Sequence, residues 1–241
     1  MKDFLKKYFT FSAEEIKGMI ISVLVIAFIF SFKEWGVDKF DFLYGLKNFI
    51  NIVLIVALAF LVREVAHRFF AGKTGLRAEY RSWTFGLLIG VIIVVLSRGE
   101  LIFLAPGGIL VHHLAGARLG AFRYGLVYKT MGWVAAAGPL ANIVLALFFK
   151  IMTLFPLNLV LIQKAISLNL WLAIFGMLPI PPLDGSKMFY ASRFMYVWVI
   201  GLVAGAAFFI NYTGVLTAII GTLVVSLIIL AMFAFTFEKP V

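Results

Sequence analysis

Glu64 and His67 lie three residues apart near the end of an apolar stretch. The residues from Leu61 to Phe70 read Leu-Val-Arg-Glu-Val-Ala-His-Arg-Phe-Phe. This is the spacing of the zinc motif His-Glu-x-x-His, with Arg63 in place of the first histidine. On an α-helix, positions 63 and 67 share one face, and two imidazoles there bind a zinc ion whose water the glutamate activates. What this stretch can do therefore depends on Arg63.

A metal held by two histidines needs a further protein ligand, and a distant carboxylate would supply it. Asp184 is the candidate, because it follows the segment Pro-Ile-Pro-Pro-Leu at residues 179–183. Three prolines in four positions end a helix, since they lack a backbone donor and fix φ. Gly185 then permits a sharp turn. We therefore expect a Pro-rich break at residues 179–185, with Asp184 on a stiff, extended loop.

The composition indicates an integral membrane protein. Of the 241 residues, 63% are hydrophobic and 13% are charged, and the mean hydropathy is +1.08, whereas soluble domains are about half apolar. The net charge of +10 comes from basic residues in short segments between apolar runs, which indicates topology and lipid partners and argues against nucleic acid. Without cysteine, the chain can form no disulfide or thiolate zinc site.

Seven apolar segments are candidates for membrane-spanning helices, which need about 20 residues each. The third and the sixth are short, so we expect an all-α, multi-pass membrane protein with six or seven transmembrane helices. No long linker interrupts the chain, which predicts a single transmembrane domain over residues 1–241. The seven segments are residues 16–32, 49–70, 83–96, 130–154, 161–178, 195–210 and 213–237.

The basic residues also predict an orientation. The lysines before residue 10 and the basic groups at 68–81, 118–129 and 187–193 are expected to face the cytoplasm, which places the N-terminus and the Glu64 motif on that side. Two consecutive cytoplasmic groups flank residues 83–111, so this segment must leave and return on one side. Its second arm contains Ala-Pro-Gly-Gly at 105–108, and irregular backbone at membrane depth is tolerated where protein covers it. We expect a re-entrant hairpin over about residues 83–111.

Three motifs in this order resemble the site-2 protease family of intramembrane zinc metalloproteases. They are Glu64-x-x-His67, Gly-Pro-Leu-Ala-Asn at 138–142, and Leu-Pro-Ile-Pro-Pro-Leu-Asp-Gly at 178–185. The resemblance covers about residues 49–196 and leaves the N-terminal helix 16–32 and the C-terminal helix pair 195–237 outside. It implies a zinc cofactor with His67 and Asp184 as ligands, Glu64 as the catalytic acid and base, and Asn142 at the substrate. It also implies a cleft that opens to the cytoplasm, with an edge strand after the motif helix.

The chain departs from this family pattern at Arg63 and at Gly176, where the family has a zinc-binding histidine and commonly an asparagine. Arginine stays protonated and has no lone pair for a metal. Three alternatives follow. The guanidinium fills the place of the zinc and pairs with Asp184 or Glu64; it extends to the membrane surface; or a histidine from elsewhere completes the metal site. That histidine would be His112 or His113, which follow the hairpin.

Two functions are consistent with this sequence. The first is a non-standard or inactive member, a pseudoprotease that keeps the cleft and binds membrane segments or lipid. The alternative is an active zinc intramembrane protease with a ligand supplied by His112 or His113. Glycines on the last two expected helices favour close helix packing, either within the chain or in a homo-oligomer.

Overall fold

The long apolar segments form helices, the structure that satisfies backbone polar groups inside a bilayer. The computed structural model describes residues 10–36, 39–113 and 128–237. Within these ranges, five helices are long and apolar enough to cross a membrane. They are α3 (Phe42–Lys73), α5 (Tyr128–Met152), α6 (Leu159–Gly176), α8 (Arg193–Tyr212) and α9 (Val215–Phe237).

Three further helices complete the described part, and the prediction of a mostly helical membrane protein is confirmed. The expected spans at 16–32 and 83–96 correspond to α2 (Ala13–Ser31) and to α4 (Thr84–Leu96), which has 13 residues. Helix α2 begins at a capping box in which Ser12 and Glu15 bond to each other's backbone amide. The third, α7 (Asp184–Ala191), follows the Pro-rich break.

The expected hairpin at 83–111 is present, with one helical and one extended arm. Strand β1 (Leu76–Ser82) precedes α4, and the returning chain forms β2 (Gly107–His113), which pairs antiparallel with β1. The Trp83 amide donates to the Pro106 carbonyl at 2.8 Å, so the chain leaves and returns at one place. The all-helical prediction therefore gains a two-stranded sheet.

Two glycines on α4 allow the extended arm to lie directly on the helix. A Cβ atom at Gly86 would come within 2.6 Å of the Ala105 carbonyl oxygen, and one at Gly90 within 2.6 Å of that of Phe103. A larger residue at either position would push the arm away. The arm's irregular backbone is thereby covered by protein, as membrane depth requires.

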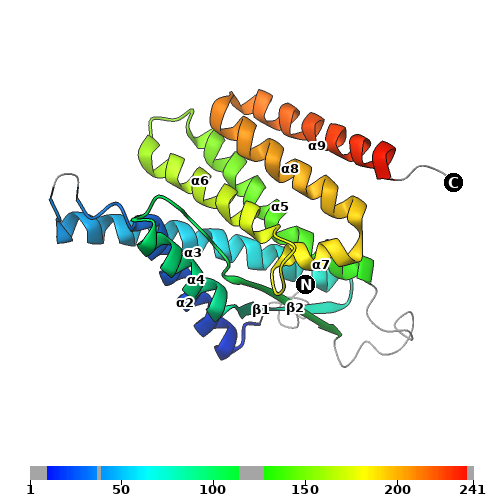
Figure 1. Ribbon diagram of the computed structural model, residues 1–241, viewed down its shortest axis with the longest axis horizontal. Helices are drawn as coiled ribbons and strands as arrows, with labels where there is room; N and C mark the ends of the chain where they lie inside the picture. The colour runs from blue at the N-terminus through cyan, green and yellow to red at the C-terminus, as the bar shows by residue number, and fades with distance from the viewer. Residues whose placement is uncertain (1–9, 37–38, 114–127, 238–241) are drawn as a thin grey trace.

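Helix α5 lies at the centre of the helix arrangement, with α3 and α6 beside it and α8 and α9 along the outer side (Figure 1). Helices α8 and α9 approach closely, because a Cβ atom at Gly201 or at Gly205 would come within 2.9 Å of the Cα of Ser226 or Thr222 respectively. These two glycines therefore serve packing within the chain.

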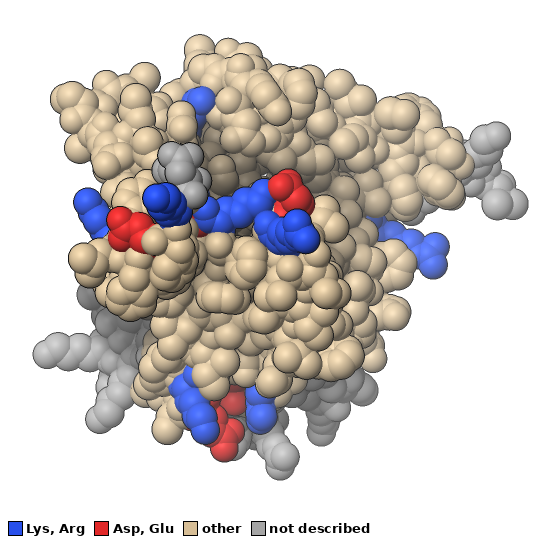
Figure 2. Space-filling model, turned by 60° about the vertical axis from the view of Figure 1, so that its left-hand side comes forward, with Lys and Arg blue, Asp and Glu red and all other residues tan. Residues whose placement is uncertain are grey.

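The outer surface suits a bilayer. Figure 2 shows one face on which most charged side chains gather in a band across the middle and at the lower edge, with a few basic ones at the upper and right margins. Exposed leucine, isoleucine and phenylalanine side chains recur along α3, α4 and α9. The basic positions before residue 10 and between residues 114 and 127 lie outside the described residues, and the orientation stays a prediction.

Candidate functional site

The Arg63 side chain of α3 reaches Asp184 of α7. Nη2 of Arg63 donates to Oδ2 of Asp184 in an ion pair that joins positions 121 residues apart. Both side chains are buried, with exposed fractions of 3% and 0%. Of the alternatives for Arg63, extension to the membrane surface is therefore wrong, and pairing with Asp184 is the arrangement present.

Asp184 is the first residue of helix α7. The predicted extended loop at this residue is wrong, because the chain resumes a helix directly after Leu183. An acidic residue in the first helical turn is favoured by the helix dipole. Its Oδ1 accepts a hydrogen bond from the Ile109 amide of β2 at 3.4 Å. Burial alone would raise the pKa of this carboxyl, but Arg63 and His67 beside it hold that pKa well below its usual range.

His67 faces the same carboxylate from α3. Its Nδ1 lies 2.8 Å from the Val134 carbonyl oxygen of α5. A carbonyl only accepts hydrogen bonds, so Nδ1 carries a proton and donates. Its Nε2 lies 3.3 Å from Oδ2 of Asp184. A backbone carbonyl that fixes Nδ1 in this way is the usual support for a histidine that binds a metal through Nε2.

Two glycines provide the space for these side chains. A Cβ atom at Gly138 on α5 would lie 2.2 Å from Nε2 of His67, and one at Gly176, the last residue of α6, would lie 3.2 Å from Nη2 of Arg63. The first position admits no larger residue while His67 stays in place. The second admits one only if the guanidinium moves.

Glu64 and Asn142 bring further polar groups into the buried region. Their exposed fractions are 1% and 0%, and neither the carboxylate oxygens of Glu64 nor the amide of Asn142 has a hydrogen-bond partner among the described residues. Buried polar groups without partners cost about 1–3 kcal/mol each, so they are rare in folded proteins. They are therefore candidates for groups that bind a polar ligand.

His112 and His113 are not brought to this site by the described structure. His112 is 47% exposed, and its Nε2 lies 3.5 Å from Oε1 of Glu79 on β1. His113 pairs with Leu76 at the far end of the sheet, four residues or about 13 Å along the strand from Ile109. No side-chain position is described for His113.

The residues at the site do not fit a zinc ion. Zinc sites in enzymes use three protein ligands, and the described residues contain no group of three or more histidine, cysteine, aspartate or glutamate side chains that could hold a metal. His67 and Asp184 face each other, but the guanidinium of Arg63 occupies the aspartate oxygen nearest His67. A cation placed there would meet a permanent positive charge.

A second buried ion pair was not anticipated from the sequence. Arg68 of α3 donates to Oε1 of Glu15 at 2.5 Å, and the same oxygen accepts from the Tyr80 amide of β1 at 2.9 Å. Helix α2 therefore binds the outer edge of β1, the strand that follows the motif helix. The Ser-x-x-Glu capping signal at residue 12 was the available clue to Glu15, but it carries no information about Arg68.

Comparison with known proteins finds a relative that matches most of the chain. The chain is 35% identical over 198 residues to the protein named "Putative zinc metalloprotease MJ0611" of Methanocaldococcus jannaschii, a match that covers 80% of this chain and 92% of the relative. No family model matches the chain, and no solved structure matches it. The matched length includes more than the motif-bearing helices.

Proposed function

This chain belongs to the family of the protein named "Putative zinc metalloprotease MJ0611", and we propose that it is a site-2 protease-like pseudoprotease, with a salt bridge in place of the metal, that binds membrane segments. The observation that carries the proposal is the single oxygen Oδ2 of Asp184. It is shared between Nη2 of Arg63 and, at 3.3 Å, Nε2 of His67.

The guanidinium of Arg63 explains how the chain can keep Asp184 and His67 without a metal. Without a metal, a buried Asp184 carboxylate would be an uncompensated charge, which is strongly destabilising. Arg63 neutralises that carboxylate, so the site folds without zinc. His67 then keeps its place through the Val134 carbonyl. Because Arg63 leaves the donor set for a metal incomplete, this site lacks the ligands that would hold zinc and its water beside Glu64.

The binding role rests on Glu64 and Asn142. Both are buried and without partners among the described residues, although a site with structural duties alone would favour apolar side chains at such positions. An unwound membrane segment presents backbone amides and carbonyls that must be satisfied in the bilayer. Groups of this kind near α3 and α5 would satisfy them.

Metal content and cleavage test the loss of proteolysis. The full chain, purified in mild detergent without chelator, is expected to contain far less than one zinc per molecule by mass spectrometry. It is also expected to leave a reporter transmembrane substrate uncut, to the same extent as Glu64→Gln. Stoichiometric zinc together with cleavage that Glu64→Gln abolishes would establish an active protease and refute the proposal.

A second measurement tests the binding role. A fluorescent transmembrane peptide with a central Gly-Pro pair, reconstituted with the chain in liposomes, is expected to bind wild type and to bind Asn142→Leu several-fold more weakly. Asn211→Leu is the matched control, because among the described residues the Asn211 amide bonds only to the carbonyl of Ala207 in its own helix. Equal binding by wild type and Asn142→Leu would remove the support for this role.

A further inference from the structure

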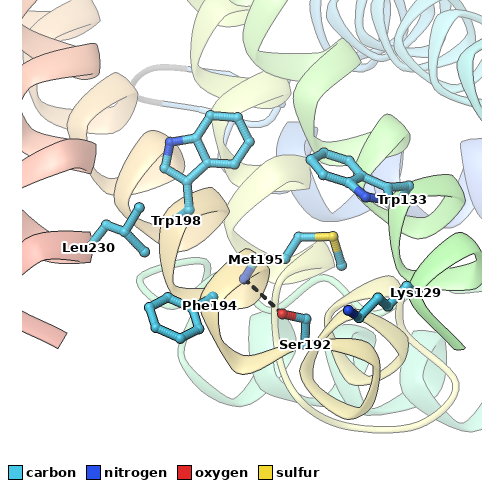
Figure 3. Close-up of a pocket in the computed structure, with 7 residues that line it drawn as sticks. All are labelled: Lys129, Trp133, Ser192, Phe194, Met195, Trp198 and Leu230. Carbon is cyan, nitrogen blue, oxygen red and sulfur yellow. Dashed lines mark hydrogen bonds between the residues drawn. The ribbon is translucent and has the colours of Figure 1, made fainter. Parts of the chain in front are cut away.

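A groove opens on the side of the helix arrangement where α5 and α8 begin and α9 ends (Figure 3). It has a volume of about 340 Å³, within the roughly 300–1,000 Å³ typical of small-ligand sites. It is distinct from the buried Arg63 site, none of whose side chains line it. The residues that line it include Lys129, Trp133, Ser192, Phe194, Trp198 and Leu230.

The polar groups of the groove are gathered at one end. In Figure 3 the amine of Lys129 and the hydroxyl of Ser192 lie together, and Trp198 and Leu230 lie at the opposite end. Lys129 is exposed and forms no ion pair with any residue that the structure describes. Arg193, also exposed, is the next residue after Ser192. The lining contains no aspartate or glutamate among the described residues, so this end attracts anions.

The remaining walls are mostly apolar and aromatic. Trp133 and Trp198 meet edge to face with ring centroids 6.3 Å apart, and Phe194 packs in the same way on Phe233 of α9 at 5.5 Å. Gly132 leaves space for the Met195 side chain at the base of the groove, because a Cβ atom at position 132 would lie 2.4 Å from the terminal methyl group of Met195. Tryptophan is enriched at the level of lipid headgroups, where its apolar ring and polar N–H are both accommodated.

From this charge and shape we propose that the groove binds one anionic phospholipid, with its phosphate at Lys129 and Ser192 and an acyl chain along Trp198 and Leu230. The positive end near the helix termini matches a headgroup at the membrane surface, and the apolar end matches a chain that points into the bilayer. An apolar transmembrane segment would leave Lys129 unpaired. The inference stands independently of the pseudoprotease proposal.

Native mass spectrometry of the full chain tests the site. The protein is reconstituted in nanodiscs of equal phosphatidylglycerol and phosphatidylcholine and then extracted into mild detergent. Wild type is expected to retain one phosphatidylglycerol. Lys129→Gln is expected to lower the ratio of retained phosphatidylglycerol to retained phosphatidylcholine about fivefold. This is the factor by which one lysine strengthens binding to an anionic lipid surface. Leu230→Trp fills the apolar end and is expected to lose both lipids, and Leu230→Phe is a smaller filling variant.

Lys73→Gln is the matched control. Lys73 is an exposed lysine at the end of α3, where it stacks on Phe69 outside the groove, so its loss changes the net charge equally. The proposal is overturned if Lys129→Gln and Lys73→Gln change the lipid ratio to the same extent. It is also overturned if both filling variants, folded as judged by gel filtration, retain lipid as wild type does, or if a protein helix is recovered in place of the lipid.

Discussion

Gly176 provides the space in which the guanidinium of Arg63 lies. A Cβ atom at position 176 would be 3.2 Å from Nη2 and 3.4 Å from Nη1 of Arg63. These are the two positions at which the sequence departs from the site-2 protease pattern it resembles, and the place of a side chain at one lies beside the side chain of the other. One departure therefore accommodates the other: because position 176 has no side chain, the guanidinium of the arginine that replaces a metal ligand fits there without moving.

Gly176→Ala tests this relationship. Alanine is favoured over glycine in a helix by about 1 kcal/mol, so the substitution alone should stabilise the end of α6. In wild type we expect instead a loss of about 1–2 kcal/mol, because the ion pair prevents the guanidinium from moving aside. In a protein that already carries Arg63→Ala, Gly176→Ala is expected to raise the free energy of unfolding. Chemical unfolding in detergent measures both, and additive effects would show that the two sites are independent.

Arg63→Ala is expected to destabilise the protein strongly. It leaves the Asp184 carboxylate buried without its cation, which costs about 3–5 kcal/mol. Adding Asp184→Asn should recover part of the loss, because the buried charge is then gone. Arg81→Ala, at an exposed arginine of β1, is the control and should change the free energy of unfolding by less than about 0.5 kcal/mol. A loss from Arg63→Ala no larger than that of Arg81→Ala would contradict the burial argument.

The sequence predicted the helical membrane fold and the meeting of two distant segments, because apolar length and motif residues are local signals. It could not decide where Arg63 points. A long, flexible cation on a helix can reach the membrane surface or the interior, and the choice depends on Gly176 and Asp184, which lie more than 100 residues away. The position of Asp184 in a helix also escaped prediction, since the prolines of residues 179–182 end one helix without showing that another begins two residues later.

Arg63→His should create a metal site that wild type lacks. The new imidazole would lie one turn from His67 on the same face of α3, with Asp184 opposite and its Oδ2 no longer bound by a guanidinium. We expect about one zinc per molecule by mass spectrometry. We also expect zinc at 100 times its dissociation constant to stabilise the variant by about 2.7 kcal/mol, whereas wild type should respond to neither zinc nor chelator. A wild type that chelator destabilises would contradict the ion-pair site.

Glu15→Ala tests whether helix α2 is fastened to the rest of the protein by the second buried pair. The change removes the carboxylate that binds Arg68 at 2.5 Å and the Tyr80 amide at 2.9 Å. Because Arg68 is 1% exposed, we expect a loss of about 3–5 kcal/mol. Amide exchange at Tyr80 should also become faster, since its acceptor is gone.

Glu14→Ala is the matched control for this change, because Glu14 lies one position earlier in the same helical turn with its side chain exposed. It should leave both the stability and the exchange of the Tyr80 amide near wild type. If Glu15→Ala destabilises the protein without faster exchange at Tyr80, the pair stabilises α3 alone. Helix α2 would then be held to β1 by other contacts, of which the 2.8 Å hydrogen bond between the Ser22 and Tyr80 hydroxyls is the strongest candidate.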